Sequence, residues 1–382
     1  NLDGPGSAMV RRFLVENALH WLHEYHIDGL RLDATHALAD DSPRHFLAEL
    51  AGAVHATARA WPALVVAEDS RNLAILVREP AEGGWGLDGV WADDFHHVVR
   101  VMLAGDRDGY YADYEGTIAE LATTLRDGWL YQGRMSRYLG RPRGTDPRGV
   151  PKRKFVIAIQ NHDQVGNRAF GDRLHHAVDP AAYRAASALL LLAPETPLLF
   201  MGQEWAATTP FLYFTDHGPE LGARVADGRR KEFARFAAFQ DEAARARIPD
   251  PQAESTFLAS RLRWEEIERP PHRGVLELYR RLLALRRTLL SEAAREGVAI
   301  GAAGEDAISV RYAGGPDRLA LVVRLRGAGP VRLDDVGEER EVLLTTEDPD
   351  VAPDPQPPRI AGGPTPAIDF ARPGAVVLRV IR

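Results

Sequence analysis

The sequence predicts an α/β protein built on part of a (β/α)8 barrel, followed by a small, sandwich-like all-β domain. The barrel prediction rests on five short apolar runs that alternate with helical stretches and end in polar or ionisable residues. Such runs are typical of a parallel sheet covered on both faces, and α/β barrels place their active sites at the carboxyl ends of the strands. After residue 293 the pattern changes to strand-like runs separated by Gly, Pro and Asp. We therefore expect a partial barrel over 1–293 and a β domain over 294–382.

The elements follow in order along the chain. Ser7 is expected to cap a first helix that ends near His26, and Ser42 with Pro43 to start a second helix. Helices are expected over Arg44 to about Arg59, Thr117–Arg126, Ala181–Leu192 and Gly274–Leu290. The barrel strands are expected in the runs Asp28–Ala34, Ala63–Asp69, Gly89–Phe95, Phe155–Asn161 and Pro197–Gln203. The β-domain strands are expected over Ile308–Tyr312, Leu319–Leu325, Val331–Leu333, Glu341–Thr345 and Ala375–Ile381, with a Pro-rich loop over Ala352–Pro366.

Composition excludes several classes of protein. The chain has 382 residues and a formal net charge of −7, with 45% apolar and 26% charged residues. Mild acidity argues against a nucleic-acid binder, which needs a basic surface, and no apolar run has the length of a membrane-spanning helix. The absence of cysteine removes disulfide scaffolds and thiolate chemistry and suits a cytoplasmic location.

Three strand ends carry a carboxylate each. Asp33 follows GLRL, Glu68 follows LVVA, and Asp163 lies in QNHDQVG. A barrel would direct all three into one mouth, where two carboxylates suffice for glycoside hydrolysis and a third would stabilise developing positive charge. Arg31 lies two residues before Asp33, hence on the same strand face, and would keep Asp33 ionised.

Other residues near these strands have less chemical significance. Position alone does not exclude Asp69, Asp93 and Asp94 as rival carboxylates. His96 and His97 follow that acidic pair, but clustering without ligand geometry is weak evidence, and we predict no metal site. The sequence contains no nucleotide-binding glycine loop and no serine-hydrolase elbow, and no cofactor is implied.

Three motifs together resemble the alpha-amylase family of retaining glycoside hydrolases. They are GLRLDATHAL, VVAEDS and QNHDQVG, which are similar in order and spacing to that family's second, third and fourth conserved regions. NLDGPGS, WADDFHH, FMGQEW and TFLASRLRW further resemble the malto-oligosyltrehalose trehalohydrolases within it. The resemblance implies cleavage of the α-1,4 bond next to a terminal trehalose unit, releasing trehalose from a maltooligosaccharide-type substrate with retention of configuration.

The same resemblance implies roles for individual residues. Asp33 becomes the nucleophile, Glu68 the general acid/base and Asp163 the transition-state stabiliser. Substrate contacts are expected from a wider set, namely Arg31, His162, His36, Asp94, His97, Gln164 and Glu204.

The chain departs from the family pattern at its amino-terminus. The family's first conserved region, an Asn-His pair ending the third barrel strand, has no counterpart here, so the five strands match the fourth to the eighth. Because the chain also starts at Asn1 rather than Met, we expect it to be the carboxyl-terminal part of a longer enzyme and inactive alone. Two alternatives stay open, a glucan branching enzyme and a non-catalytic glucan-binding remnant.

Overall fold

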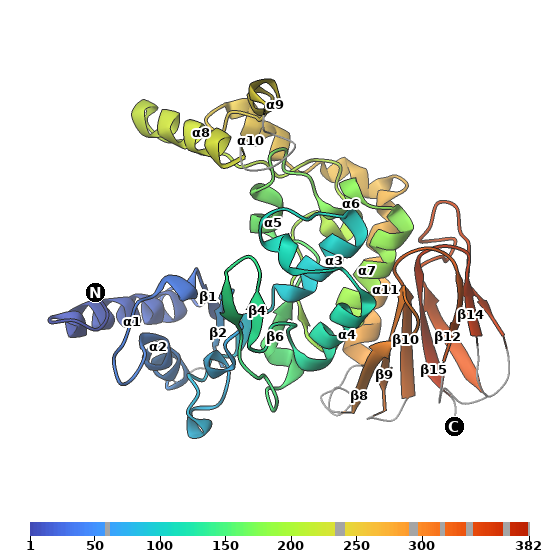
Figure 1. Cartoon of the computed structure of the whole chain (residues 1–382), viewed down its shortest axis with the longest axis horizontal. Helices are drawn as coiled ribbons and strands as arrows, with labels where there is room; N and C mark the ends of the chain where they lie inside the picture. The colour runs from blue at the N-terminus through green and yellow to red at the C-terminus, as the bar shows by residue number, and fades with distance from the viewer. Residues whose placement is uncertain are drawn as a thin grey trace. The chain divides into compact units, whose positions relative to one another are not determined.

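The computed structural model describes residues 1–57, 62–233, 241–289, 297–313, 318–333, 339–361 and 367–380 (Figure 1). The chain divides into two compact units, each made of several segments. Unit 1 comprises Asn1–Phe95, Thr123–Ile157 and Pro194–Thr196, and unit 2 comprises His96–Ala122, Ala158–Ala193 and Pro197–Arg382. The domain boundary predicted between 293 and 294 lies outside the described residues.

Unit 1 is organised around parallel strands. Their order in the sheet is β1-β2-β3-β6-β7, and the pairings from β1 through β6 are parallel. The elements of this unit are α1 (Ser7–His23), β1 (Gly29–Leu32), α2 (Phe46–His55), β2 (Leu64–Ala67), β3 (Gly89–Trp91), the hairpin β4 (Arg134–Ser136) and β5 (Arg141–Arg143), and β6 (Phe155–Ile157). Three elements cross from one unit to the other, α3 (Asp94–Ala104), α4 (Ile118–Asp127) and β7 (Thr196–Pro197).

The sheet forms because its strands are apolar on both faces. Val65, Val90 and Phe155 are completely buried, as expected of strands in a covered parallel sheet. Gly29 allows β1 to approach β2 closely, because a Cβ there would lie 2.5 Å from the carbonyl oxygen of Leu64. The sequence predicted the positions of β1, β2, β3 and β6 correctly. The strand expected over Pro197–Gln203 is wrong for most of its length, because β7 covers Thr196–Pro197 only and Gln203 begins a 3₁₀ turn.

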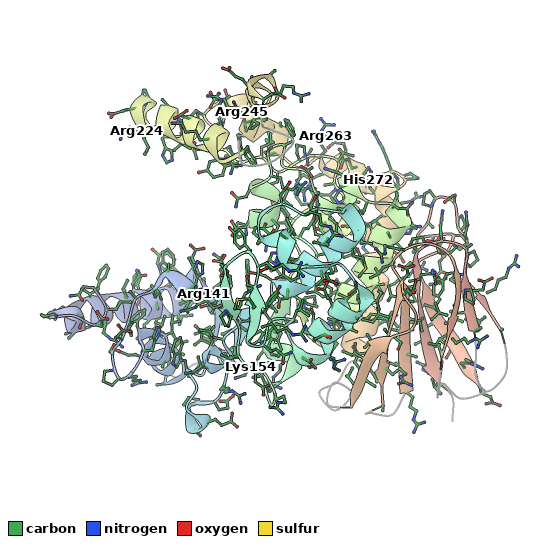
Figure 2. The ribbon with its side chains drawn as sticks, in the orientation of Figure 1. Arg141, Lys154, Arg224, Arg245, Arg263 and His272 are labelled. Carbon is green, nitrogen blue, oxygen red and sulfur yellow. The ribbon has the colours of Figure 1, made fainter. Side chains whose placement is uncertain are left out.

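A buried lysine directly before β6 contacts the loop that precedes β3. Lys154, labelled in Figure 2, donates from Nζ to the carbonyl oxygens of Val77 at 2.8 Å and Leu87 at 3.3 Å. It also pairs with Glu79 Oε1 at 2.8 Å. An ammonium can be buried only where its donors are satisfied, so this residue fixes the loop that leads into β3.

Among the described residues, unit 2 contains seven complete helices and two antiparallel sheets. Its helices are α5 (His162–Gly166), α6 (Leu174–Ala177), α7 (Pro180–Leu192), α8 (Pro219–Phe233), α9 (Glu242–Ala246), α10 (Glu254–Ser260) and α11 (His272–Leu289). Its strands are β8 (Val298–Ala302), β9 (Ala307–Tyr312), β10 (Arg318–Arg324), β11 (Gly329–Arg332), β12 (Arg340–Thr345), β13 (Arg359–Ile360), β14 (Ala367–Phe370) and β15 (Gly374–Val380).

These last strands form two sheets, ordered β12-β15-β10-β9-β8 and β11-β14-β13. Residues of both sheets share one hydrophobic core, which includes Val322 and Val376 from the first and Val331 and Phe370 from the second. The five predicted strands correspond to β9, β10, β11, β12 and β15, while β8, β13 and β14 were not predicted. Leu290, the residues 362–366 and Ile381, which end three of the expected elements, lie outside the described residues.

No helix in the described parts of the chain combines the length and the apolar character that crossing a membrane requires.

Candidate active site

The guanidinium of Arg31 joins two of the three predicted carboxylates in unit 1. Its Nη1 lies 2.5 Å from Asp33 Oδ1, and its Nη2 lies 2.7 Å from Glu68 Oε2. Hydrogen bonds between guanidinium and carboxylate are charge-assisted and stronger than neutral ones. Asp33 and Glu68, which are 35 positions apart in the chain, are therefore held at one site by one cation.

The strand register brings these residues together. Leu32 pairs with Ala67 where β1 and β2 end, so Asp33 and Glu68 each occupy the next position along parallel neighbours. The backbone continues the pairing, because the N–H of Glu68 donates to the carbonyl of Leu32 at 2.9 Å. Carboxyl ends of parallel strands meet at the same edge of a sheet, which is where α/β proteins bind ligands.

The residue after Asp33 has a left-handed backbone. Ala34 has φ 44° and ψ 45°, a conformation that costs a residue with a Cβ about 1–2 kcal/mol. In this conformation its N–H donates to Glu68 Oε2 at 2.8 Å. Strain of this kind gathers at functional sites, where the surroundings enforce it. Here it supplies a hydrogen-bond donor to the oxygen of Glu68 that also forms the ion pair with Arg31.

The two carboxylates differ in their access to solvent. The side chain of Asp33 is 77% exposed, whereas that of Glu68 is 18% exposed. The guanidinium between them also lies over the ring of Trp91, 4.5 Å from its centroid, which is a favourable cation–π geometry. The arrangement provides one accessible carboxylate and one shielded carboxyl group, the kind of pair that acid-assisted nucleophilic substitution requires.

Asp69, a rival in the sequence, is completely buried. Its carboxylate accepts from Thr35 Oγ1 at 2.9 Å and from Arg71 Nη2 at 2.6 Å. Thr35 in turn donates from its backbone N–H to the carbonyl of Glu68 at 3.0 Å. These contacts tie together the loops that follow β1 and β2, so Asp69 supports the site rather than facing a substrate.

Asp94 was predicted to bind substrate, but its side chain is completely buried. Oδ2 accepts from Asn72 Nδ2 at 2.8 Å and from the backbone N–H of Leu130 at 2.7 Å, and Oδ1 pairs with Arg143 Nη1 at 3.1 Å. The burial and the internal partners favour a structural role over the expected sugar contact.

Asp163 and His162 lie on α5 in unit 2. His162 Nε2 is 3.6 Å from Asp163 Oδ1, and both side chains are partly exposed. Asn161 caps this short helix, because its Oδ1 accepts from the backbone N–H of Gln164 at 2.8 Å. The third predicted carboxylate, Asp163, is thus partly exposed on the short helix that follows β6 in the chain.

Gln164 and His97 belong to one aromatic cluster of unit 2. Gln164 Oε1 accepts from the hydroxyls of Tyr110 at 2.7 Å and Tyr111 at 3.2 Å. His97 is buried against the same tyrosines, with its ring centroid 4.6 Å from that of Tyr110, and its Nδ1 lies 3.0 Å from the hydroxyl of Tyr114. His97 therefore orients the tyrosines that hold Gln164, and its burial favours this role over a direct sugar contact.

The other two predicted contacts differ in their surroundings. His36 is exposed on a 3₁₀ turn, Thr35–Ala37, directly after the Asp33 loop. Glu204 lies in unit 2, in the 3₁₀ turn Gln203–Trp205, and is half-buried. Its Oε2 is screened from solvent without a hydrogen-bond partner among the described residues.

Within the described residues, no group of three or more His, Asp or Glu side chains is arranged to hold a metal ion.

Sequence reasoning missed four contributors to these surroundings. Trp91 lies inside the expected run Gly89–Phe95, and its place beside Arg31 follows only from the strand register. Ala34 contributes a backbone N–H, which leaves no trace in residue type. Tyr110 and Tyr111 lie far from any motif, and only their adjacency as an aromatic pair could have drawn attention.

Comparison with known proteins finds curated relatives of this chain. No family model matches the chain. A malto-oligosyltrehalose trehalohydrolase from Deinococcus radiodurans is 46% identical over 348 residues, which are 88% of this chain and 56% of that protein. One from Arthrobacter ramosus is 45% identical over 345 residues, 88% of this chain and 57% of the relative. The chain is a homologue of these trehalohydrolases. It spans a little over half of their length.

Solved structures agree with this relationship. A Salmonella typhimurium protein assigned as an alpha amylase has a TM-score of 0.83 and 34% identity, covering 97% of this chain and 60% of its own. The alpha-amylase from H. orenii has a TM-score of 0.58 at 14% identity, covering all of this chain and 66% of its own. Alpha-amylases have the (β/α)8 barrel fold, so the α/β class predicted from the sequence is confirmed.

The branching-enzyme alternative finds a weaker match. A 1,4-alpha-glucan branching enzyme from Myxococcus xanthus is 35% identical over 130 residues, only 28% of this chain and 17% of that enzyme. The trehalohydrolase homologues are both more similar and matched over three times as much of the chain.

Proposed function

We propose that this chain carries the catalytic carboxylates of a retaining glycoside hydrolase that cleaves the α-1,4-glucosidic bond next to a terminal trehalose and releases trehalose. The observation that carries the proposal is the ion pairing of Arg31 with both Asp33 and Glu68 at adjacent strand ends. The substrate is inferred from the names of the trehalohydrolase homologues.

In this proposal, Asp33 is the nucleophile. Its exposed carboxylate attacks the anomeric carbon, and the glycosidic C–O bond breaks as Glu68 gives its proton to the departing oxygen. The proton of Glu68 would reside on Oε1, because Oε2 already pairs with the Arg31 guanidinium and accepts from the N–H of Ala34. Water then hydrolyses the glycosyl-enzyme with Glu68 as the base, and Asp163 stabilises the positive charge on the sugar in both steps.

Further residues would contact the substrate. Arg31, His162, His36, Gln164 and Glu204 present partly or fully exposed polar groups and are proposed as sugar contacts. Asp94 and His97 are proposed to hold the surrounding loops instead, because their side chains are buried and internally bonded.

We also propose a fold assignment that is finer than the α/β class. Strands β1, β2, β3, β6 and β7 would correspond to strands four to eight of a (β/α)8 barrel, with catalytic residues over 1–293 and a sandwich-like domain over 294–382. The face-to-face core of the two antiparallel sheets supports the sandwich. A cytoplasmic location, suggested by the absence of cysteine, stays a prediction.

Mutation of the nucleophile tests the mechanism. The full-length gene product that carries this sequence, and its Asp33→Ala variant, would be assayed for trehalose release from maltotriosyltrehalose. We expect a loss in kcat of at least about 10³-fold, since removal of a nucleophile abolishes the covalent route. A loss of only a few-fold would contradict the assignment, and proton NMR of the first products would check for retention of the α-configuration.

The same assay separates the alternatives. A branching enzyme would form new α-1,6 linkages in amylose and release no trehalose. A glucan-binding remnant would bind maltooligosaccharides without hydrolysing them in the full-length product.

A further inference from the structure

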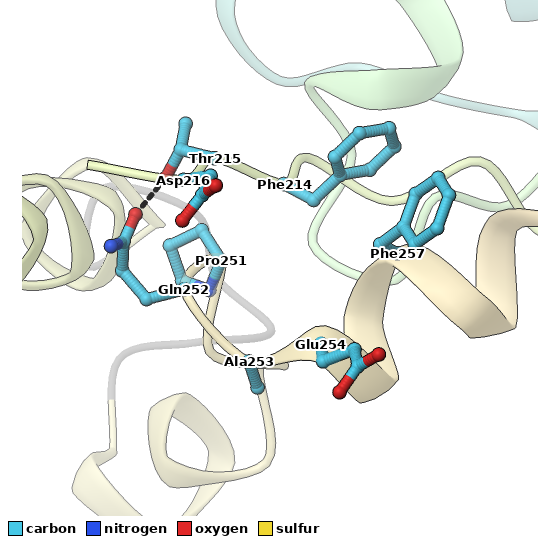
Figure 3. Close-up of a pocket in the computed structure, with 8 residues that line it drawn as sticks. All are labelled: Phe214, Thr215, Asp216, Pro251, Gln252, Ala253, Glu254 and Phe257. Carbon is cyan, nitrogen blue, oxygen red and sulfur yellow. Dashed lines mark hydrogen bonds between the residues drawn. The ribbon is translucent and has the colours of Figure 1, made fainter.

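A cavity of about 560 Å³ opens in unit 2, outside the residues of the catalytic proposal. Ligand pockets in proteins commonly measure about 300–1,000 Å³. The cavity is lined by two segments of chain. One comprises residues 214–216, and the other comprises residues 251–257, which lead into α10. Figure 3 shows its lining residues, namely Phe214, Thr215, Asp216, Pro251, Gln252, Ala253, Glu254 and Phe257.

The cavity has an aromatic end. Phe214 and Phe257 lie edge to face with ring centroids 5.3 Å apart, and in Figure 3 they stand together on one side of the lining. Their side chains are 38% and 45% exposed. Large apolar groups that stay exposed in a concave site indicate a binding surface.

The opposite end is polar and acidic. Asp216 and Glu254 are exposed, and neither carboxylate has an ion-pair partner among the described residues. The wall between the ends is fixed, because the hydroxyl of Thr215 donates to Gln252 Oε1 and the amide of Gln252 donates to the carbonyl of His217 at 2.9 Å. The backbone N–H of Thr215 also donates to the carbonyl of Pro251 at 2.8 Å.

This cavity connects to α5, which carries Asp163, through a succession of ring contacts. A Cβ on Gly166 of α5 would lie 3.5 Å from the ring of Phe211. Phe211 is 6.1 Å from Phe214 between ring centroids, and Phe214 meets Phe257 as described. Arg229 of α8 braces the same region, donating from Nη2 to the carbonyl of Gly166 at 3.1 Å. The route from the proposed stabiliser to the cavity is therefore continuous within unit 2.

The chemistry matches a sugar. A hexose ring has apolar C–H faces that pack on aromatic rings and hydroxyls that donate to carboxylates, and the cavity offers both groups across a fixed wall. We propose that this cavity binds glucose units of an α-1,4-glucan chain away from the cleaved bond. The inference rests on the proposed function for the identity of the glucan, and its occupant is the distal part of the maltooligosaccharide substrate.

A binding measurement tests the cavity without requiring catalysis. Maltoheptaose would be titrated by calorimetry into the full-length gene product with Asp33→Asn and into the same protein that also carries Phe257→Ala. We expect about tenfold weaker binding with Phe257→Ala, because the substitution removes the apolar surface that a sugar ring would cover. Glu254→Gln should also weaken binding. Leu258→Ala on the same helix, outside the cavity lining, is the matched control and should bind as well as the Asp33→Asn parent.

Kinetics against substrate length supply the second readout. Phe257→Ala in the otherwise unaltered protein should raise KM for maltohexaosyltrehalose about tenfold and leave KM for maltosyltrehalose unchanged. Equal maltoheptaose affinity in the Phe257→Ala and control proteins would overturn the cavity proposal, as would an equal rise of KM for both substrates. Phe257-dependent maltoheptaose binding in a protein that releases no trehalose would support the cavity and reject only the proposed function.

Discussion

At the scale of single residues, the site depends on Arg31. It contacts Asp33 and Glu68 with different nitrogens and lies over the ring of Trp91. Two carboxylates at one strand edge repel each other, and a cation between them offsets that repulsion. A planar guanidinium with several donors serves both partners at once, whereas an ammonium on a flexible stem is a point charge.

Substitution of Arg31 should therefore separate charge from geometry. Arg31→Lys keeps the charge but cannot hold both carboxylates in the observed arrangement, and we expect kcat for trehalose release to fall about 10- to 100-fold. Arg12→Lys is the control, because Arg12 is an exposed arginine paired only with Glu16 of the same helix. Wild-type turnover in Arg31→Lys would show that the bridging geometry is dispensable.

Substitution of Asp94 distinguishes a substrate-binding role from a structural role for this residue. Asp94→Asn leaves Arg143 buried without its counter-charge, and we expect the free energy of unfolding in urea to fall by about 3 kcal/mol. KM of the folded protein should not change, because Asp94 does not reach solvent. Asp227→Asn removes an exposed pair with Lys231 and should change stability by less than about 0.5 kcal/mol. A higher KM with unaltered stability would restore the sugar-binding role.

At the scale of elements, the sequence predicted the positions of β1, β2, β3 and β6 because their apolar runs are short and clearly bounded. The register of these strands follows from their pairing. Helix starts were harder. The first helix was expected to be capped by Ser7, yet Gly6 holds that position with φ 82° and Ser7 is already helical. The second helix was expected from Arg44 but begins at Phe46, because Asp40, a loop residue outside the predicted helix, takes the first backbone N–H. The ends of the apolar runs pointed to Asp33, Glu68 and Asp163 as candidate residues. The left-handed backbone at Ala34 depends on its tertiary contact with Glu68, which no local sequence pattern encodes.

Asp40 links the two helices and supplies a pH dependence. It pairs with Arg11 of α1 at 3.0 Å and accepts from the N–H of Phe46, which opens α2, at 2.5 Å. Burial raises the pKa of Asp40, but hydrogen bonds from Ser42 and Phe46 and the charge of Arg11 outweigh burial and lower the pKa to about 2. The folded-state pKa lies below the ordinary value of about 3.9, so this carboxylate stabilises the fold above pH 4 and loses that contribution as pH falls towards 2.

Urea denaturation across this range measures the effect. The stability difference between the wild type and Asp40→Asn should be about 2 kcal/mol larger at pH 6 than at pH 2. Glu220→Gln is the control, because Glu220 pairs with Arg224 of the same helix and both side chains are exposed. A difference that does not vary with pH would mean that Asp40 acts through its shape and hydrogen bonds alone.

At the scale of the whole molecule, the antiparallel sheets are tied to α7 by buried polar contacts within unit 2. Arg184 of α7 donates from Nη2 to Glu347 Oε1 at 2.5 Å and from Nε to the carbonyl of Thr346 at 3.0 Å. Arg372 holds the other oxygen of Glu347 at 2.5 Å, and the hydroxyl of Tyr312 donates to the carbonyl of Leu192 at 2.5 Å. A buried charge network of this kind demands that all members stay together. Helix α7 and the antiparallel sheets of unit 2 should therefore lose structure together.

Arg184→Met tests this coupling. Removing one member of a buried ion pair costs about 3–5 kcal/mol, because the remaining carboxylate stays desolvated. Hydrogen exchange followed by mass spectrometry should show α7 and β15 losing protection together and by the same free energy, while protection in β1 and β2 of unit 1 changes less. Arg326→Met is the control, since Arg326 is exposed and pairs only with Asp306 at the surface. Loss of protection confined to α7, with β15 unaffected, would mean that the sheets fold as a domain independent of the helix they contact.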